Sequence, residues 1–589
     1  MYLRKCYRAR DGKRHAYWAL VKSVRTARGP RQEVVAYLGD LDEAGRLGVQ
    51  QTAGGDCSAG QQNLFATPEA RYVEVNLSGV VVEGMRKFGG PWLALQLINR
   101  LGLKDELDRL MPVGREEVPW SIMSLVLVIC RLCDPSSELR LAEHLYERSS
   151  LPDLLGVAPE KINDDRLYRS LDELLPHKAA LEKHLKNRLG ELFNLNYDLL
   201  LYDVTSTYFE GQCAGNEQAK RGYSRDSRGD CKQVCIALVV SRCGMPLGYE
   251  LFAGNKADVT TVREIVTAME DRYGKADRVW VMDRGMASAA NVEFLKEGGR
   301  RYIMGTHKTL LRKYEKQLIA PDWNLVHEGL EVKLCSDPDG GAEGKALASE
   351  GKALASETFI LCRSAARREK EKAMHEKFEK RIEEGLTSLV KLAEKRSLTA
   401  VEIAQRVGRL LGQNTRAAGA FKTEVTTDPL GKVVLKWEKV QAWRSWAELS
   451  EGCYLLRSNV SDWTAAELWR AYMQLTEAET AFRIHKSDLS LRPIWHQKKE
   501  RVQAHVLVCF LAYVLWKTLS QLCKSAGLGD EPRKVLDEIG TIQTVDVVLP
   551  TRCGRRIRKR CVGKPTEHQA ILLHKLGMNL PRSLERVDL

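Results

Sequence analysis

Two short apolar runs of this chain each end in an aspartate, and a polar, turn-prone stretch follows each aspartate. The first run is LLLYDVTSTYFEG, which contains Asp203, and the second is VWVMDRGMAS, which contains Asp283. A short apolar run bounded by turn residues is typical of a buried strand. The pattern therefore predicts two strands of a covered sheet, each of which brings a carboxylate to the rim of that sheet.

The segments around the two aspartates alternate between strand and helix patterns. After the strand that carries Asp203, the sequence predicts a hairpin at 231–252, a helix at 258–274, a strand at 278–283, a helix at 288–299 and a strand at 301–307. Three strands followed by alternating helices and strands indicate an α/β unit of ribonuclease H type. In that order the first and fourth strands are neighbours, so Asp203 and Asp283 are expected to lie side by side.

A third carboxylate, Glu479 in YMQLTEAETAFRIHK, follows much later in the chain. One helix–strand step needs only about 30 residues, so a subdomain is predicted between Asp283 and Glu479. This insert contains the tandem repeat GKALASE-GKALASE at 344–357, which is expected in a surface loop. It also contains Trp437, Trp443 and Trp446. These tryptophans could stack on unpaired bases, but core packing is favoured for at least two of them.

The spacing around Glu479 leaves its local structure open. Tyr472, Glu479 and Lys486 are seven residues apart, so they would share one face of an unbroken helix. Alternatively, Thr476 and Glu479 fit a capping box, which would begin a new helix and leave Tyr472 on the preceding one. From spacing alone, an ion pair with Arg483 four residues on is the favoured role of Glu479.

Three carboxylates without His or Cys companions would form a site of hard oxygen ligands. Such a site suits Mg²⁺, or Mn²⁺ in its place, rather than zinc. Two such ions can clamp the attacking and leaving oxygens of a phosphodiester, which predicts nucleic-acid cleavage or joining. The close pair Cys130 and Cys133 has no second pair at zinc spacing, and is interpreted as two buried cysteines on a helix.

Length and charge agree with a multidomain protein that binds a polyanion. The chain has 589 residues, of which 44% are apolar, and its formal net charge is +14. That length predicts three or more domains, and that charge favours nucleic acid as a partner. The N-terminus has no signal-peptide pattern, and the apolar runs Ile122–Cys133 and Val506–Trp516 are too short to span a bilayer. Fifteen scattered cysteines predict reduced thiols in a cytoplasm.

The fold class predicted is multidomain α/β, with a ribonuclease H-like core that an insertion subdomain interrupts and that β-rich and all-helical N-terminal regions precede. The N-terminal sheet would touch DNA or be a simple structural hairpin, and the helices of the second region would bind DNA. The C-terminal segment TRCGRRIRKRCVGK is either a solvated basic strand or a DNA-backbone contact. The predicted regions are 1–70 (β-rich module and linker), 71–194 (helical), 195–308 (core, first part), 309–460 (insertion), 461–520 (core, second part) and 521–589 (C-terminal basic region).

The motifs together resemble the IS-four superfamily of bacterial insertion-sequence transposases, in its long-insert branch. Tyr472-x2-Leu475-x3-Glu479-x6-Lys486 resembles the Y-x2-R-x3-E-x6-K signature of that superfamily, with Leu475 in place of the arginine. YDVTSTYFEG and MDRGM resemble its first and second carboxylate boxes. GNKADVTT and RPIWHQKKERVQAHVLVCFLAYVL are similar to segments of the long-insert branch.

The resemblance implies a DDE transposase that acts by cut-and-paste transposition on double-stranded DNA, namely terminal inverted repeats and target DNA. It implies that the protein acts as a homodimer bound to DNA and does not associate with a membrane. Asp203 would bridge two Mg²⁺ ions, and Asp283 and Glu479 would each complete one side. The expected DNA contacts are Tyr472, Lys486, Arg284, Arg555, Arg556, Arg558, Lys559 and Arg560. For Arg284, a structural ion pair is an equal alternative. The departure at Leu475 puts one phosphate contact in doubt.

Two other functions remain open from the sequence. A stand-alone metal-dependent nuclease could use the same core, although the large helical N-terminal region argues against it. A DNA-binding relic that no longer cuts is disfavoured because all three carboxylates are present.

Overall fold

The computed structural model describes residues 2–10, 13–26, 29–39, 74–336, 338, 357–396, 398–429 and 431–588. The predicted linker at 41–70 and the tandem repeat up to residue 356 lie outside these ranges. The chain forms two compact units, Met1–Glu74 and Val75–Leu589.

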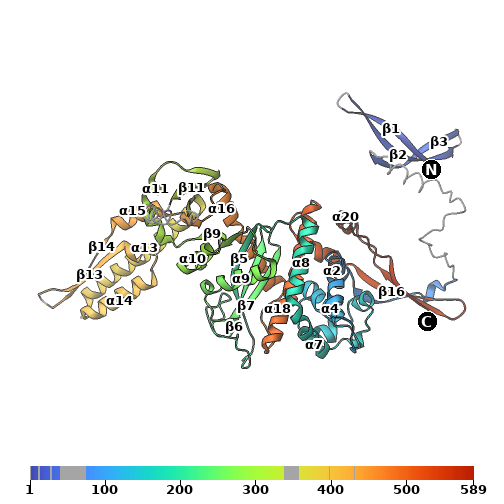
Figure 1. The fold of residues 1–589 in the computed structure, drawn as a ribbon, viewed down its shortest axis with the longest axis horizontal. Helices are drawn as coiled ribbons and strands as arrows, with labels where there is room; N and C mark the ends of the chain where they lie inside the picture. Colours follow the sequence, from blue (N-terminus) through green and yellow to red (C-terminus); the bar gives the residue numbers. More distant parts are fainter. Residues whose placement is uncertain are drawn as a thin grey trace. The chain divides into compact units, whose positions relative to one another are not determined.

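The first unit contains an antiparallel sheet of three strands (Figure 1). Its strands are β1 (Tyr2–Arg10), β2 (Lys13–Thr26) and β3 (Gly29–Gly39). The β-rich pattern predicted for this region agrees with these three strands. Four basic residues in YLRKCYRAR interrupt the apolar alternation of β1.

The second unit begins with a strand, β4 (Val81–Lys87), and continues with the predicted helices. These are α2 (Gly89–Arg100), α3 (Leu103–Leu110), α4 (Trp120–Cys133), α5 (Glu138–Arg140), α6 (Leu151–Leu155), α7 (Asp164–Leu174) and α8 (Lys178–Phe193). As predicted, α7 begins at Asp164, where the side chain of Asn163 accepts a hydrogen bond from the backbone N–H of Arg166 at 2.9 Å.

A long apolar helix near the end of the chain completes the core of this helical region. α18 (Lys499–Ser525) packs against α2, α4 and α7, and Figure 1 shows the four together. Among the described residues, α18 is the one helix long and apolar enough to cross a membrane, but 89% of its most apolar window is buried inside the protein. The apolar run Val506–Trp516 therefore lies within a longer helix that is buried. Residues 75–194 share one hydrophobic core with α18 rather than forming a core alone.

In the part of the chain that the structure describes, nine strands form one mixed sheet in the order β10-β11-β12-β15-β9-β8-β5-β6-β7. The strands predicted for the catalytic core are β5 (Leu199–Tyr208), β6 (Gln233–Ser241), β7 (Pro246–Ala253), β8 (Val279–Met282) and β9 (Arg301–Gly305). The connecting helices are α9 (Val262–Tyr273) and α10 (Ala289–Glu297). β5 and β8 pair in parallel, with Tyr202 opposite Met282, so the predicted adjacency of the first and fourth strands is confirmed.

The inserted segment does not form a wholly separate subdomain, because four of its strands extend the core sheet. These are β10 (Asn324–His327), β11 (Leu330–Ser336), β12 (Thr358–Ser364) and β15 (Cys453–Ser458), and β15 pairs with β9. Periodicity cannot show which strands pair, so this continuity was not predicted. α11 (Glu315–Ile319) lies between β9 and β10.

The rest of the insert has its own core. It consists of α13 (Ala365–Lys395), α14 (Ala400–Gln413), β13 (Phe421–Thr427), β14 (Val433–Lys439) and α15 (Gln441–Ser450). Trp437 and Trp443 are partly buried against this core, and Trp446 against a neighbouring one. The core interpretation of these tryptophans therefore applies to all three.

The basic C-terminal segment belongs to a folded sheet. α19 (Pro532–Gly540), β16 (Gln543–Pro550), β17 (Arg556–Val562), α20 (Glu567–Lys575) and β18 (Ser583–Asp588) follow α18, and the sheet order is β18-β17-β16-β4. β4 comes from the start of the second unit, so the two ends of this unit are joined through β4 and β16. Residues 521–589 are therefore not a detached basic tail.

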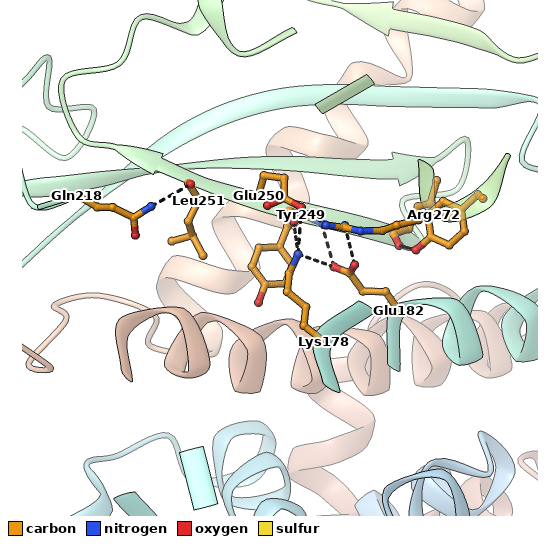
Figure 2. A network of polar contacts seen from close by, with 9 residues as sticks. Lys178, Glu182, Gln218, Tyr249, Glu250, Leu251 and Arg272 are labelled. Atoms are coloured by element: carbon orange, nitrogen blue, oxygen red, sulfur yellow. Dashed lines mark hydrogen bonds and ion pairs between the residues drawn. The ribbon is translucent and has the colours of Figure 1, made fainter. Parts of the chain in front are cut away.

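A buried carboxylate links α8 to the sheet (Figure 2). Glu182 on α8 has no exposed side-chain surface, and it forms ion pairs with Lys178 at 3.3 Å and with Arg272 of α9 at 2.7 Å. Both cations also pair with Glu250 of β7. Lys178 in addition donates a hydrogen bond to the carbonyl of Tyr249 at 2.7 Å. These contacts fix the helical region against the sheet that carries the aspartates.

Candidate active site

Asp203 and Asp283 occupy equivalent positions on two neighbouring parallel strands. Each follows directly after the last paired residues, Tyr202 on β5 and Met282 on β8. The strand residues before them are buried, because the sheet is covered on both faces there. Asp203 is half-buried, and Asp283, where β8 ends, is exposed. Asp283 lies just beyond the end of β8, but Asp203 lies within β5, which continues to Tyr208 in pairing with β6, so the rim prediction is correct for Asp283 alone.

Glu479 reaches the same place from a helix. It lies on α17 (Leu475–Arg483), which packs against β5 through a buried face formed by Ala478, Ala481 and Phe482. Glu479 itself is exposed. Arg483, its alternative partner, pairs instead with Asp488 at 3.8 Å, and no ion pair of Glu479 occurs within the described ranges. The ion-pair interpretation of Glu479 is therefore wrong for this structure.

The surroundings of Asp203 raise the pKa of its carboxyl group. Burial, with smaller contributions from the charges of Asp283 and Glu479, raises the pKa of Asp203 to about 7. The backbone N–H of Val204, which donates to its Oδ1 at 2.8 Å, and the charge of Arg225 act in the opposite direction. A carboxyl group whose neighbours are also acids holds a proton more tightly. The site therefore carries excess negative charge that a cation would neutralise.

The three carboxylates do not surround a single point. Among the described residues, only Glu138, His496 and His505 bring one ligand atom each within 4.8 Å of the others. Asp203, Asp283 and Glu479 are thus spaced more widely than the ligands of one ion.

The second helix of the site places a tyrosine beside Asp283. Tyr472 lies on α16 (Ala465–Met473), and its hydroxyl donates to Asp283 Oδ1 at 3.4 Å, a long hydrogen bond. Gly305, at the end of β9, makes room for it, since a Cβ there would lie 2.5 Å from the Tyr472 hydroxyl oxygen. Tyr472 was predicted from its spacing as a DNA contact, and its hydroxyl also supports the second aspartate.

Comparison with known proteins identifies the family. The model of the family described as "Transposase DDE domain" matches residues 195–515, which is more than half of the chain. The chain belongs to the DDE transposase family. Among curated proteins no match was found. A solved structure, the cryo-EM structure of a piggyBac transposase synaptic complex with hairpin DNA, is similar at 10% identity and a TM-score of 0.34, over 80% of this chain and 82% of that one.

The helix that carries Glu479 in this DDE transposase is short and bounded on both sides. α16 ends at Met473, α17 begins at Leu475, and a π-helical turn, Ile484–Asp488, follows. The prediction of one unbroken helix from Tyr472 to Lys486 is therefore wrong. The alternative is correct in that a new helix begins at Leu475 and Tyr472 lies on the preceding one, but no side chain caps that new helix, so the capping box at Thr476 does not form. The signature is thus assembled from two helices and a turn.

Lys486 lies in that turn and is already paired. Its Nζ lies 2.9 Å from Oδ1 of Asp226, whose side chain is only 3% exposed, and Arg492 pairs with the same oxygen. Burial lowers the pKa of Lys486. Asp226 belongs to the long connection between β5 and β6, so this ion pair fixes that connection to the helix turn after Glu479. Contact of Lys486 with DNA stays a prediction.

The same connection supplies a cation that was not predicted. Arg225 pairs with Asp258, and its backbone N–H donates to Ser206 Oγ at 3.2 Å. Its charge lowers the pKa of Asp203. The GYSRDSRGD segment contains two arginines, and only the fold shows that Arg225 is the one whose charge acts on Asp203.

The other predicted DNA contacts fall into two groups. Arg558 pairs with Glu83 at 3.0 Å, and Arg560 pairs with Asp546 at 2.6 Å and with Asp153, so both are used within the C-terminal sheet. The second group is exposed and forms no ion pair within the described part of the chain: Arg284, Arg555, Arg556 and Lys559. Leu475, in place of the signature arginine, is partly buried against the main core.

Proposed function

We propose that this DDE transposase belongs to the IS-four superfamily of bacterial insertion sequences. It would cut DNA at transposon ends and join the freed 3′-hydroxyl to target DNA. The observation that carries the proposal is that Asp203 and Asp283 each follow the last β5–β8 pair and that the helix carrying Glu479 packs against β5. Burial, and to a smaller extent the charges of Asp283 and Glu479, raises the pKa of Asp203. The motif resemblance and the family match over residues 195–515 support it.

The donor set fits divalent cations of the Mg²⁺ type, with Mn²⁺ as a substitute. All three donors are carboxylates, which Mg²⁺ prefers, and their excess negative charge is only partly offset by Arg225. Asp203, Asp283 and Glu479 would hold the ions between them. When bound, such ions activate water and stabilise the charge that develops on a phosphodiester.

The residues around the carboxylates would orient them. The backbone N–H of Val204 fixes one oxygen of Asp203, and the Tyr472 hydroxyl fixes one oxygen of Asp283. Glu479 has no protein partner within the described ranges, so it is free to approach a metal. Arg284, next to Asp283, is the exposed cation nearest in sequence to the site and would contact a phosphate.

Double-stranded DNA is the proposed partner, as terminal inverted repeats and as target. Lys486 would contact the phosphate near the scissile bond, held in place by Asp226. Arg555, Arg556 and Lys559 would contact the backbone without sequence preference. We also propose that the protein acts as a homodimer on DNA and in the cytoplasm.

A strand-transfer assay separates this function from its alternatives. Purified protein is incubated with Mg²⁺, a pre-cut transposon end with a free 3′-hydroxyl and a supercoiled target plasmid. A transposase joins the end to the plasmid, a stand-alone nuclease only degrades DNA, and a relic that binds without cutting gives neither product. Absence of joined product, with DNA binding intact, would contradict the proposal.

A further inference from the structure

Three side chains outside the carboxylate site form a second cluster. Glu138 is the first residue of α5, His505 lies on α18, and His496 lies in the segment that precedes α18. One potential ligand atom from each lies within 4.8 Å of the other two. Glu138 and His505 are buried, each at 6% exposed, and the His496 side chain is nearly so. The proposed transposition chemistry uses none of them.

The distance between Glu138 and His496 is typical of two ligands on one metal. Glu138 Oε1 lies 3.3 Å from His496 Nε2. A charge-assisted hydrogen bond between such groups is shorter, about 2.7–2.9 Å. Two ligands on a tetrahedral zinc ion with bonds of about 2.0–2.1 Å are separated by about 3.3 Å. The gap therefore fits a shared ion better than a direct hydrogen bond.

His505 has a buried ring nitrogen that is available as a metal ligand. Its Nε2 lies 3.3 Å from the carbonyl oxygen of Leu491, which can only accept, so Nε2 carries the hydrogen and Nδ1 carries the lone pair. That Nδ1 is buried and has no hydrogen-bond partner. A buried acceptor without a partner is costly. Metal-binding histidines commonly donate their other N–H to a backbone carbonyl, as His505 does here.

Glu138, His496 and His505 all line a cavity of about 300 Å³ that is partly open to solvent. Its lining includes Ser136, Tyr168 and Arg131. Arg131 donates to the carbonyl oxygen of Ser490 at 3.4 Å, so its guanidinium is a neighbour of the cluster and would moderate the affinity for a cation. The cavity has room for a water molecule as a fourth ligand.

We propose that Glu138, His496 and His505 bind one Zn²⁺ ion, with water from the cavity as the fourth ligand. Two imidazoles and a carboxylate are a zinc donor set, unlike the all-carboxylate set at Asp203. The ion would join the start of α5 to the segment between the Glu479 helix and α18. It would therefore stabilise the attachment of the helical region to the second half of the catalytic core.

Zinc content tests this proposal without reference to catalysis. The full chain carrying Asp203→Asn and Glu479→Gln is stripped with a chelator, incubated with ZnCl₂, desalted and analysed for bound metal. One zinc per chain is expected, together with a rise in Tm on zinc addition. Glu138→Gln and His496→Gln should remove both effects. His327→Gln, at an exposed histidine elsewhere, should retain them.

Cobalt separates this site from adventitious binding by the cysteines. Co²⁺ held by nitrogen and oxygen shows weak visible bands, whereas thiolate ligands add intense charge-transfer bands in the near ultraviolet. The proposal expects the weak bands alone. This spectrum is recorded on the parent protein, the full chain carrying Asp203→Asn and Glu479→Gln, so it does not depend on whether the ligand variants fold. The proposal is overturned if the parent binds no zinc, if thiolate bands appear at one equivalent, or if folded Glu138→Gln and His496→Gln proteins retain the ion.

Discussion

Asp203 and Asp283 stand on adjacent parallel strands, each one residue beyond the pair formed by Tyr202 and Met282. This register fixes both carboxylates through the backbone of the sheet, before any metal or DNA binds. The helix that carries Glu479 then adds a third negative charge beside Asp203. Apposed acids of this kind have consequences for pH dependence, stability and catalysis.

The stability of the metal-free protein should depend on pH through Asp203. Its pKa is raised from 3.8 to about 7, so the folded chain keeps a proton that the unfolded chain releases between these values. Stability due to this group should therefore fall as pH rises through that window, by at most about 1.4 kcal/mol per pH unit. Tm is measured with chelator for wild type and Asp203→Asn. The variant should be the more stable at high pH, and the difference should vanish toward acid pH.

Added Mg²⁺ is the control for that prediction. It should raise the wild-type Tm at high pH and leave Asp203→Asn nearly unchanged. Parallel pH profiles of the two metal-free proteins would contradict the account of Asp203.

Lys486 and Asp226 should act as one unit. Lys486→Ala removes one partner of a buried carboxylate, and Arg492 remains to compensate in part. Each single variant, Lys486→Ala and Asp226→Asn, should slow single-turnover cleavage, while overall DNA affinity stays nearly unchanged. The double variant should be no slower than the worse single one, with a coupling energy of about 0.5–3 kcal/mol. Simple addition of the two effects would show that Asp226 does not position Lys486.

The exposed cations of the C-terminal sheet should provide affinity without specificity. Neutralising Arg555, Arg556 and Lys559 should weaken binding to all DNA sequences alike, and each lost phosphate contact should lower the salt slope by about 0.9. Arg558→Gln is the matched control, because Arg558 is already paired with Glu83. Filter binding across a salt series measures the affinity and the salt slope of each variant. An unchanged slope in the triple variant would assign these residues to a solvated surface.

The buried Glu182 should be needed for stability. Glu182→Ala leaves Lys178 and Arg272 with Glu250 alone, and breaking a buried ion pair costs about 3–5 kcal/mol. Glu264→Ala removes a more exposed pair with Lys256 and should cost less than about 1 kcal/mol. Thermal unfolding of both variants gives the comparison. Equal small losses would show that the network in Figure 2 does not anchor α8.

The sequence predicted the part of the fold that depends on local pattern. The apolar runs before Asp203 and Asp283 are strands, and the order of strands and helices correctly predicted that these two strands are neighbours. Around Glu479 the sequence left open whether one helix or two carry the signature; the structure has two, and spacing gave no sign of the π-helical turn that holds Lys486. Such breaks are set by tertiary packing, which overrides local preference.

Contacts between distant segments could not be predicted from pattern. The pairing of β15 with β9, and of β4 with β16, joins residues that no periodicity relates. The same holds for Arg225, whose charge acts on Asp203, and for the Glu138–His496–His505 cluster. The three carboxylates were found because each lies in a motif of its own. Their catalytic role is still a prediction.

Metal-dependent cleavage of transposon-end DNA by carboxylate variants tests the central claim most directly. Asp203→Asn, Asp283→Asn and Glu479→Gln keep side-chain shape and remove one anionic ligand each. Asp277→Asn is the matched control, because Asp277 is exposed and lies just before the start of β8, at the end away from Asp283. Each of the three variants should bind end DNA normally, but its cleavage should fall to the level seen without metal, while Asp277→Asn cuts like wild type. Near-native cleavage by any one of the three would contradict its assignment as a metal ligand.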